Sequence, residues 1–211
     1  MAARGARPVI SCRMVTNPAA PVLDLFLETG AYLKGHFRLT SGLHSSEYLQ
    51  CALVLAHPRH AETLGRALAE GVARLAGERK IETVVSPAMG GLIIGHEVAR
   101  ALGARHIFTE RDADRKMVLR RGFTLRAGET AVVIEDVVTT GGSSLEVVEL
   151  LKAAGADVLA AGSIIDRSGG RADLGLPRVA LATLNVVSWE PAQCPLCAQG
   201  LPVVKPGSRP A

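Results

Sequence analysis

The sequence predicts an α/β fold, with a parallel sheet flanked by helices. Two apolar, β-branched runs, residues 131–134 and 158–165, are typical of strands buried on both faces of a parallel sheet. A third run of this kind covers residues 83–86. The runs at 83–86 and 131–134 each lead through a short loop into helical spacing, which favours right-handed crossovers whose loops meet at one edge of the sheet. We expect the functional site at that edge.

Composition limits the class of protein. A chain of 211 residues suits one domain with a substantial core, and no apolar run is long enough to cross a bilayer, so we expect no membrane partner. The formal charge of +4 permits nucleic-acid binding, but with 3% aromatic residues the chain lacks stacking platforms. A polyanionic small substrate explains the charge equally well. Four scattered cysteines are too few for a disulfide framework, which favours a reducing cytoplasm.

The first 20 residues are interpreted as a disordered extension, so the predicted domain covers residues 21–211. This extension carries three arginines but no continuous apolar segment, which argues against a secretory signal. Met14 is an alternative start to Met1. Residues 21–30 have proline near the start and glycine at the end, and they predict a short helix.

The next segment predicts two extended pieces joined by a turn. Phe37 and Leu39 alternate with polar residues, and Ser41 and Gly42 supply the turn. The chain then restarts in an extended form that reaches Tyr48.

A helix and a strand precede the first glycine loop. Residues 58–76 place apolar side chains at helical spacing before a terminating glycine. The strand at 83–86 leads to Gly90 and Gly91, which let the backbone approach an anion because they carry no Cβ. The alternative is that these glycines only allow close packing. A helix follows over residues 92–102.

A strand near residues 105–109 opens into a charged segment at residues 110–122. Five cations against three anions leave this segment with a net charge of +2. A mobile basic loop of this length inside a compact domain is usually functional. The alternative is a solvated, charged hairpin.

Residues 131–144 are the most informative stretch. The buried run meets Glu135 and Asp136, then a Thr/Gly/Ser turn, and Ser143 and Glu146 have the spacing of a capping box. Free amides at a helix start favour phosphate, while two carboxylates suit sugar hydroxyls or hydrated Mg²⁺. The spacing matches neither Gly-x-x-x-x-Gly-Lys-Ser/Thr nor Gly-x-Gly-x-x-Gly. An ordinary strand-to-helix turn explains the serine and glycines but not the adjacent carboxylates.

The strand at 158–165 ends at Asp166 and Arg167. An arginine at this edge, beside the predicted phosphate loop, is suited to hold a carboxylate through two parallel hydrogen bonds. The alternative is an ion pair with Asp166 or Asp173. Residues 179–184 predict the last strand of the sheet.

Cys194 and Cys197 have the spacing of half a zinc knuckle. No second cysteine pair or histidine lies nearby in the sequence, so we interpret them as a plain structural or surface pair. A metal site completed by two subunits is the alternative.

Three segments carry a family resemblance. Residues 134–144 resemble the phosphoribosyl pyrophosphate (PRPP) motif of type I phosphoribosyltransferases, in which an acidic pair, two apolar residues and Thr-Thr-Gly-x-Ser follow an apolar run. Residues 37–48 resemble the hood that the orotate-specific members place over the base, and residues 166–170 resemble their base-binding turn. The similarity extends over about residues 21–209.

The resemblance implies a type I phosphoribosyltransferase fold with a small hood at about residues 30–52 and a flexible lid at 110–122. It implies transfer of the phosphoribosyl group of PRPP to N1 of orotate in pyrimidine biosynthesis, with Mg²⁺ as cofactor. The products are orotidine 5′-monophosphate and pyrophosphate. It also implies a homodimer in which the lid reaches the neighbouring subunit's site.

The resemblance assigns roles residue by residue. The residues expected to bind PRPP are Ala88, Met89, Gly90, Gly91, Arg111, Lys116, Glu135, Asp136, Val137, Val138, Thr139, Thr140, Gly141, Gly142 and Ser143. Those expected to bind orotate are Tyr48, Leu49, Thr139 and Arg167. Arg111, Lys116 and Asp136 are expected to be catalytic. No direct protein ligand is assigned to Mg²⁺, which is expected near Glu135 and Asp136 through PRPP and water.

Two departures from the family leave other functions open. Thr40 and Gly90 stand where relatives usually carry a basic residue, so the segment 110–122 must supply the cations for pyrophosphate. A purine phosphoribosyltransferase is one rival, although it gives no reason for the hood or Arg167. A non-catalytic, PRPP-sensing regulator that binds nucleic acid is the other, because it would tolerate both departures.

Overall fold

The computed structural model describes residues 20–39 and 41–206. The predicted N-terminal extension, the alternative start at Met14 and the departure at Thr40 lie outside the described residues. None of the described helices is both long and apolar enough to span a membrane.

The main sheet has six strands in the order β5-β4-β3-β6-β7-β8. Their bounds are β3 (Thr83–Pro87), β4 (Arg105–Arg111), β5 (Met117–Leu119), β6 (Thr130–Val138), β7 (Asp157–Asp166) and β8 (Arg178–Thr183). Five strands are parallel, and β5 alone pairs antiparallel with its neighbour β4. From β3 the chain moves outward to β4, whereas from β6 it moves the other way, to β7 and β8. The gap between β3 and β6 is therefore the topological switch point, where open α/β sheets bind ligands.

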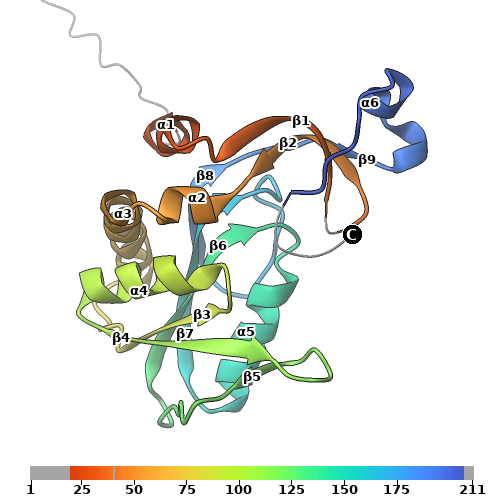
Figure 1. The fold of residues 1–211 in the computed structure, drawn as a ribbon. Coiled ribbons are helices and arrows are strands. Elements are labelled where there is room, and N and C mark those ends of the chain that lie inside the picture. The colour runs from red at the N-terminus through yellow and green to blue at the C-terminus, as the bar shows by residue number, and fades with distance from the viewer. Residues whose placement is uncertain (1–19, 40, 207–211) are drawn as a thin grey trace, which may run out of the picture.

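Helices cover both faces of this sheet (Figure 1). On one face lie α3 (Pro58–Ala76) and α4 (Gly91–Leu102), and on the other lies α5 (Gly142–Ala153). The helices α3 and α4 approach so closely that a Cβ on Gly65 would lie 2.5 Å from Cβ of Glu97. The predicted α/β architecture is confirmed, and the predicted helix at 58–76 has the bounds of α3.

A smaller three-stranded sheet lies above the carboxyl edge of the main sheet (Figure 1). It contains β1 (Tyr32–Arg38), β2 (His44–Leu49) and β9 (Ser188–Trp189). The remaining helices are α1 (Ala20–Glu28), α2 (Cys51–Leu55), the 3₁₀ helix η1 (Pro191–Gln193) and α6 (Pro195–Ala198). Strand β9 pairs with β2, and Val204 bonds to the outer edge of β1, so the C-terminal segment covers both edges of the β1–β2 hairpin.

Two local predictions are wrong. The segment 110–122 is not an open loop at its start, because β4 continues to Arg111 and turns back as β5. Ser143 and Glu146 do not form a capping box: α5 begins at Gly142 with Gly141 as its N-cap, and the first amide of the helix donates to Oγ1 of Thr140 at 3.5 Å. Ser143 is therefore already inside the helix, and Glu146 is free to pair with Arg111 instead.

Candidate active site

The candidate site lies at the switch point of the main sheet. The loop after β3 leads into α4, and the loop after β6 leads into α5. Because β3 and β6 are neighbouring parallel strands, the N-termini of α4 and α5 lie side by side at the carboxyl edge of the sheet. The first amides of a helix have no acceptor within the helix, and the helix dipole makes that end positive. The edge is therefore built to accept anions.

The loop after β6 forms a small phosphate-sized cavity. Its volume is about 80 Å³, and its lining includes Glu135 and residues 137–144. Thr139, Thr140, Gly142 and Ser143 are exposed there. Gly141 adopts a φ of 86°, which favours glycine, and a Cβ at this position would lie 3.0 Å from Leu174. The positive φ of Gly141 therefore allows the tight turn that joins β6 to α5 beside the cavity.

The acidic pair forms one wall of this site. Glu135 is only 9% exposed, and Asp136 is half-buried. Oε1 of Glu135 accepts the Asp136 amide at 3.2 Å, and Oδ1 of Asp136 accepts the Val137 amide at 2.8 Å. Burial, together with the charge of Asp136, raises the pKa of Glu135 well above its ordinary value. A cation or a hydroxyl donor arriving at this wall would relieve that penalty.

The glycine loop after β3 packs directly against the acidic pair. A Cβ on Gly90 would lie 2.6 Å from Oδ1 of Asp136, and one on Gly91 would lie 3.0 Å from the carbonyl oxygen of Ile134. The Ala88–Met89 peptide bond in this loop is cis, and Met89 is exposed. The space that Asp136 occupies thus explains the glycine at position 90, where the family resemblance led us to expect a basic residue.

A larger cavity of about 610 Å³ lies beside the phosphate loop, under the β1–β2 hairpin. Tyr48 and Leu49 line it from β2, Thr139 lines it from the phosphate loop, and Arg167 lines it from the turn after β7. All four residues predicted to bind the base are therefore brought together. Tyr48 packs on Phe37 with ring centroids 5.9 Å apart, and burial raises the pKa of Tyr48.

Arg167 is held beside the phosphate loop with an unused donor. Because β6 and β7 are paired, its amide donates to the Val138 carbonyl at 2.8 Å. Its Nε is buried and has no hydrogen-bond partner among the described residues. Burial lowers the pKa of Arg167, although nearby Tyr48 and Glu47 oppose that shift. A buried donor without a partner is costly, so a ligand that accepts from it gains affinity.

The two aspartates considered as partners of Arg167 bind elsewhere. Oδ2 of Asp166 accepts from Arg178 at 2.8 Å, and Oδ1 of Asp173 accepts the Gly175 amide at 2.9 Å. The alternative of an intramolecular ion pair for Arg167 is therefore wrong.

The β4–β5 hairpin brings one of its two predicted cations to the site. Arg111 binds Glu146 through two nitrogens at 2.9 and 3.1 Å, and its Nη2 lies 3.4 Å from Oγ of Ser143. The Glu146 carboxylate raises the pKa of Arg111. Lys116 is exposed, and among the described residues it lines neither of the two site cavities.

Several residues that line the larger cavity were not predicted from the sequence. Arg171 lines the larger cavity after the Gly169–Gly170 turn, and Val186 and Ser188 approach it from the far side. Arg171 had a local signal, since it is a cation next to the predicted base-binding turn. Val186 and Ser188 had none, because only the pairing of β9 with β2 brings them there.

No histidine lies near Cys194 and Cys197 in the sequence, but the fold brings two histidines to them. His36 and His44, from the β1–β2 hairpin, lie beside both cysteines. The sequence gives no sign of this contact, because His44 and Cys197 are 153 positions apart.

Comparison with known proteins agrees with this geometry. The family model of the phosphoribosyl transferase domain matches residues 54–189. The class defined by fold and site is therefore that of the phosphoribosyltransferases. The orotate phosphoribosyltransferase of Pelotomaculum thermopropionicum is 54% identical over 188 residues, covering 89% of this chain and 96% of the relative. That of Desulforamulus reducens is 51% identical, with the same two coverages.

A solved structure supports the same assignment. The orotate phosphoribosyltransferase of Aeropyrum pernix superposes with a TM-score of 0.65 at 26% identity, covering 77% of this chain and 93% of its own. An adenine phosphoribosyltransferase gives a TM-score of 0.62 at 18% identity, which is a likeness of fold alone. The chain belongs to the orotate phosphoribosyltransferase family.

Proposed function

We propose that the chain transfers the 5-phosphoribosyl group of PRPP to N1 of orotate, which yields orotidine 5′-monophosphate and pyrophosphate for pyrimidine biosynthesis. The observation that carries this proposal is Arg167. Its buried Nε has no partner among the described residues, and it lines a cavity of about 610 Å³ beside the phosphate loop. Orotate carries a ring carboxylate, which is the group that an arginine fork binds best.

The smaller cavity suits the 5′-phosphate of PRPP, and the larger cavity suits orotate. The amides and hydroxyls of Thr139, Thr140 and Ser143 suit the 5′-phosphate, because they surround the 80 Å³ cavity at the start of α5. Glu135 and Asp136 suit the ribose hydroxyls as hydrogen-bond acceptors. Orotate then lies between Arg167 and the Tyr48–Leu49 backbone, with Thr139 at the boundary.

The acidic pair also fits Mg²⁺. A buried carboxylate whose pKa is raised, next to a second carboxylate and a phosphate cavity, suits a hard cation that keeps several waters and binds substrate oxygens. Glu135 and Asp136 would hold it through water and PRPP. Bound there, Mg²⁺ supplies neutralisation of the charge that builds on the departing pyrophosphate.

Pyrophosphate departure leaves positive charge on the ribosyl carbon, as in glycoside hydrolysis. No covalent nucleophile is required, so the protein contributes positioning and electrostatics. The backbone amides at the start of α4, which begins at Gly91, are suited to bind pyrophosphate. Arg111 lies at the same edge of the sheet, near Ser143. Release of Arg111 from Glu146 and movement of the β4–β5 hairpin would then cover the substrates and exclude water.

We further propose that the enzyme works in the cytoplasm as a homodimer whose hairpin serves the neighbouring site, with Lys116 at its tip as a second contact to pyrophosphate. Residues 21–211 are proposed to act as one domain. The purine rival gains no support, because a purine base offers no carboxylate to Arg167. The regulator rival predicts PRPP binding without turnover and nucleic-acid retention that falls steeply with salt.

The test is the fall in orotate ultraviolet absorbance after addition of PRPP and Mg²⁺. Wild type should consume orotate but not adenine or hypoxanthine. Arg167→Ala should raise the orotate KM by roughly 10- to 100-fold, since a charge-assisted hydrogen bond contributes about 1.5–3 kcal/mol. The matched control is Arg79→Ala, which removes an exposed arginine paired with Asp157. Absence of turnover by a folded, PRPP-binding wild type would sink the proposal, and unchanged orotate kinetics in Arg167→Ala would sink the base-site assignment.

A further inference from the structure

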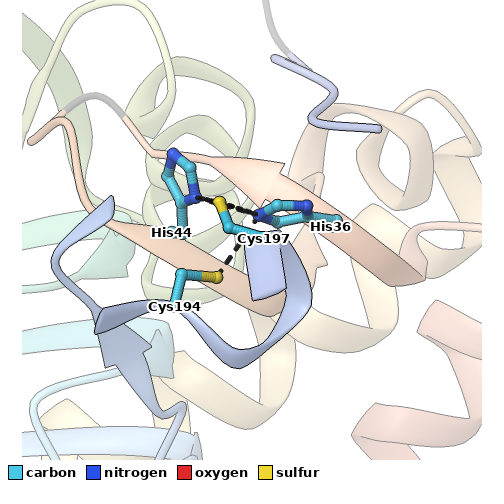
Figure 2. Close-up of side chains that lie close together, drawn as sticks. All are labelled: His36, His44, Cys194 and Cys197. Carbon is cyan, nitrogen blue, oxygen red and sulfur yellow. Dashed lines mark hydrogen bonds between the residues drawn. The ribbon is translucent and has the colours of Figure 1, made fainter. Parts of the chain in front are cut away.

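Four side chains from opposite ends of the described chain meet at one point outside the active site. His36 in β1 and His44 in β2 face Cys194, the N-cap of α6, and Cys197 within α6 (Figure 2). The four candidate ligand atoms all lie within 4.8 Å of one another. Three of the residues are buried, with exposed fractions of 4% for His36, 6% for His44 and 3% for Cys194. Cys197 closes the cluster at the surface.

Four of the six distances between these atoms are close to those between ligands around one small cation, and all six are at most 4.8 Å. Tetrahedral Zn²⁺ with bonds of about 2.3 Å to sulfur and about 2.05 Å to nitrogen places N and S ligands roughly 3.6 Å apart and two N ligands roughly 3.3 Å apart. The observed N···S distances are 3.4 Å and 3.7 Å from Nε2 of His36 to Cys194 and Cys197, and 3.3 Å from Nδ1 of His44 to Cys197. The two ring nitrogens are 2.9 Å apart.

Hydrogen bonding alone does not account for this convergence. Nδ1 of His36 lies 2.8 Å from the Leu201 carbonyl oxygen, which can only accept, so this nitrogen carries the ring proton and Nε2 presents one lone pair. Three groups, namely Nδ1 of His44 and both sulfurs, approach that lone pair. One lone pair accepts one good hydrogen bond. A cation at the centre satisfies all four ligand atoms together.

The Leu201 contact is itself typical of a metal site. A metal-bound histidine almost always donates its other ring N–H to a carbonyl or carboxylate, which fixes the tautomer and directs the lone pair at the metal. The Cys-x-x-Cys spacing on a short helix start matches that of structural zinc sites. The two histidines lie diagonally across the β1–β2 hairpin, where Arg38 pairs with His44, so the hairpin holds their rings on one face.

We propose that His36, His44, Cys194 and Cys197 bind one Zn²⁺ in a closed, structural His₂Cys₂ site within a single chain. Four protein ligands leave no open position for substrate or water, so the site does not take part in chemistry. It fastens α6 to the β1–β2 hairpin across 158 sequence positions between His36 and Cys194. His44 lies on the same strand as Tyr48, which lines the base cavity, so the metal would hold the roof of that cavity in place.

The decisive measurement is the metal content of the full-length chain, purified without chelators or a histidine tag and analysed by mass spectrometry of its metals. We expect close to one equivalent of zinc per chain. After removal of zinc under reducing conditions, added Co²⁺ should give the strong visible bands of a tetrahedral site and thiolate charge-transfer absorption in the near ultraviolet. Because Cys197 is exposed, Cys197→Ser should fold, yet it should lose most of the metal and the charge-transfer intensity.

Two controls separate this site from other effects. Cys51→Ser and His60→Ala remove a cysteine and a histidine outside the cluster, and both should keep a full equivalent of zinc. The zinc-free protein, assayed with Mg²⁺ restored, should melt roughly 5 °C or more below the zinc form and show a raised orotate KM. The metal content and the melting temperature do not depend on whether orotate is the substrate, because both are measured without it.

Two results would show that the four residues hold no metal, and a third would overturn the choice of zinc. One is a reduced, folded wild type that carries no zinc and gives no tetrahedral cobalt spectrum. The other is a Cys194–Cys197 disulfide in protein purified anaerobically with reductant, since that would occupy both sulfurs. A different tetrahedral metal, such as iron, bound by the same four residues would overturn the choice of zinc.

Discussion

Glu135 is buried beside another carboxylate, so its ionised form is disfavoured in the free protein. Burial and the charge of Asp136 both raise its pKa. A carboxyl whose pKa is raised on folding holds its proton more tightly in the native state than in the unfolded state. It therefore lowers stability as the pH rises above its ordinary value of about 4.3. The site keeps this group at a cost to the fold, which indicates a functional demand.

The first residue-scale prediction concerns Glu135→Gln. Glutamine removes the charge but keeps the shape, so we expect the melting temperature at pH 7.5 to rise by a few degrees, about 2–4 °C per kcal/mol. Turnover should fall, because an acceptor for the ribose hydroxyls and Mg²⁺ is lost. Differential scanning calorimetry and the orotate assay measure the two effects. A variant that is both less stable and fully active would contradict the prediction.

Gly90 gives a second residue-scale prediction. Its φ of −57° suits any residue, so Gly90→Ala adds no backbone strain, and the added Cβ acts only through its 2.6 Å approach to Asp136. Displacement of that carboxylate should lower kcat/KM for PRPP about 10-fold with little loss of stability. Steady-state kinetics with varied PRPP, alongside a thermal melt, provide the test. Wild-type kinetics would show that the position of Asp136 is unimportant.

At the scale of elements, Glu129, which immediately precedes β6, links that strand to β3 and β4 at the edge opposite the active site. It accepts from Thr83 at the start of β3, from Arg105 at the start of β4 at 2.8 Å, and from the Arg126 amide at 2.9 Å. Burial by itself acts to raise the pKa of Glu129, but these hydrogen bonds lower it below its ordinary value overall. The network lines a cavity of about 490 Å³ whose charged groups bind one another.

The network predicts a pH dependence of stability. Because the pKa of Glu129 is lowered on folding, its contribution is present above the ordinary value of about 4.3 and is lost as the pH falls through the lower native value. Glu129→Gln should destabilise the protein by about 1–3 kcal/mol at pH 7, and the difference from wild type should shrink toward pH 3. Urea unfolding at several pH values measures this. Activity of the folded variant should match wild type, because the network lies away from the site.

The elements also show where sequence reasoning succeeds. Helix α3 was predicted with its observed bounds because apolar spacing, an initial proline and a final glycine are all local signals. The capping-box prediction failed because the N-cap of α5 is Gly141, in the left-handed region, two residues before Ser143. For residues 110–122 the charged hairpin was only the alternative to an open loop, because β5 is a strand of three residues and too short to show apolar alternation.

At the scale of the whole molecule, the proposed homodimer makes a complementation prediction. Lys116→Ala impairs the hairpin and Asp136→Asn impairs the site, and each homodimer should be weakly active. If the hairpin serves the neighbouring subunit, a mixed dimer contains one site with both parts intact, so mixing and reassociation should restore activity. The measurement is turnover after co-expression with two different tags. No recovery in purified mixed dimers would show that each hairpin serves its own site.

The sequence predicted the phosphate loop and the base-binding Arg167, but not how the C-terminal segment packs on the β1–β2 hairpin above them. The phosphate loop and Arg167 each follow a buried strand, so the rule that parallel strands share a carboxyl edge brings them together. The pairing of β9 with β2, and the meeting of His36 with Cys194, depend on contacts between distant segments that leave no periodic trace. Those contacts exist only in the folded structure.

The two edges of the β1–β2 hairpin are covered by β9 and Val204, which the ribosome adds about 140 residues or more after the hairpin. Ser45 bonds to the Val187 carbonyl across 142 positions, and Val204 closes the other edge. A nascent chain leaving the ribosome therefore exposes this hairpin with both edges unpaired, which is a template for wrong association between chains. Distant contacts of this kind also slow folding. The roof of the base cavity therefore cannot be completed until residues 187–204 have been synthesised, after every strand of the main sheet.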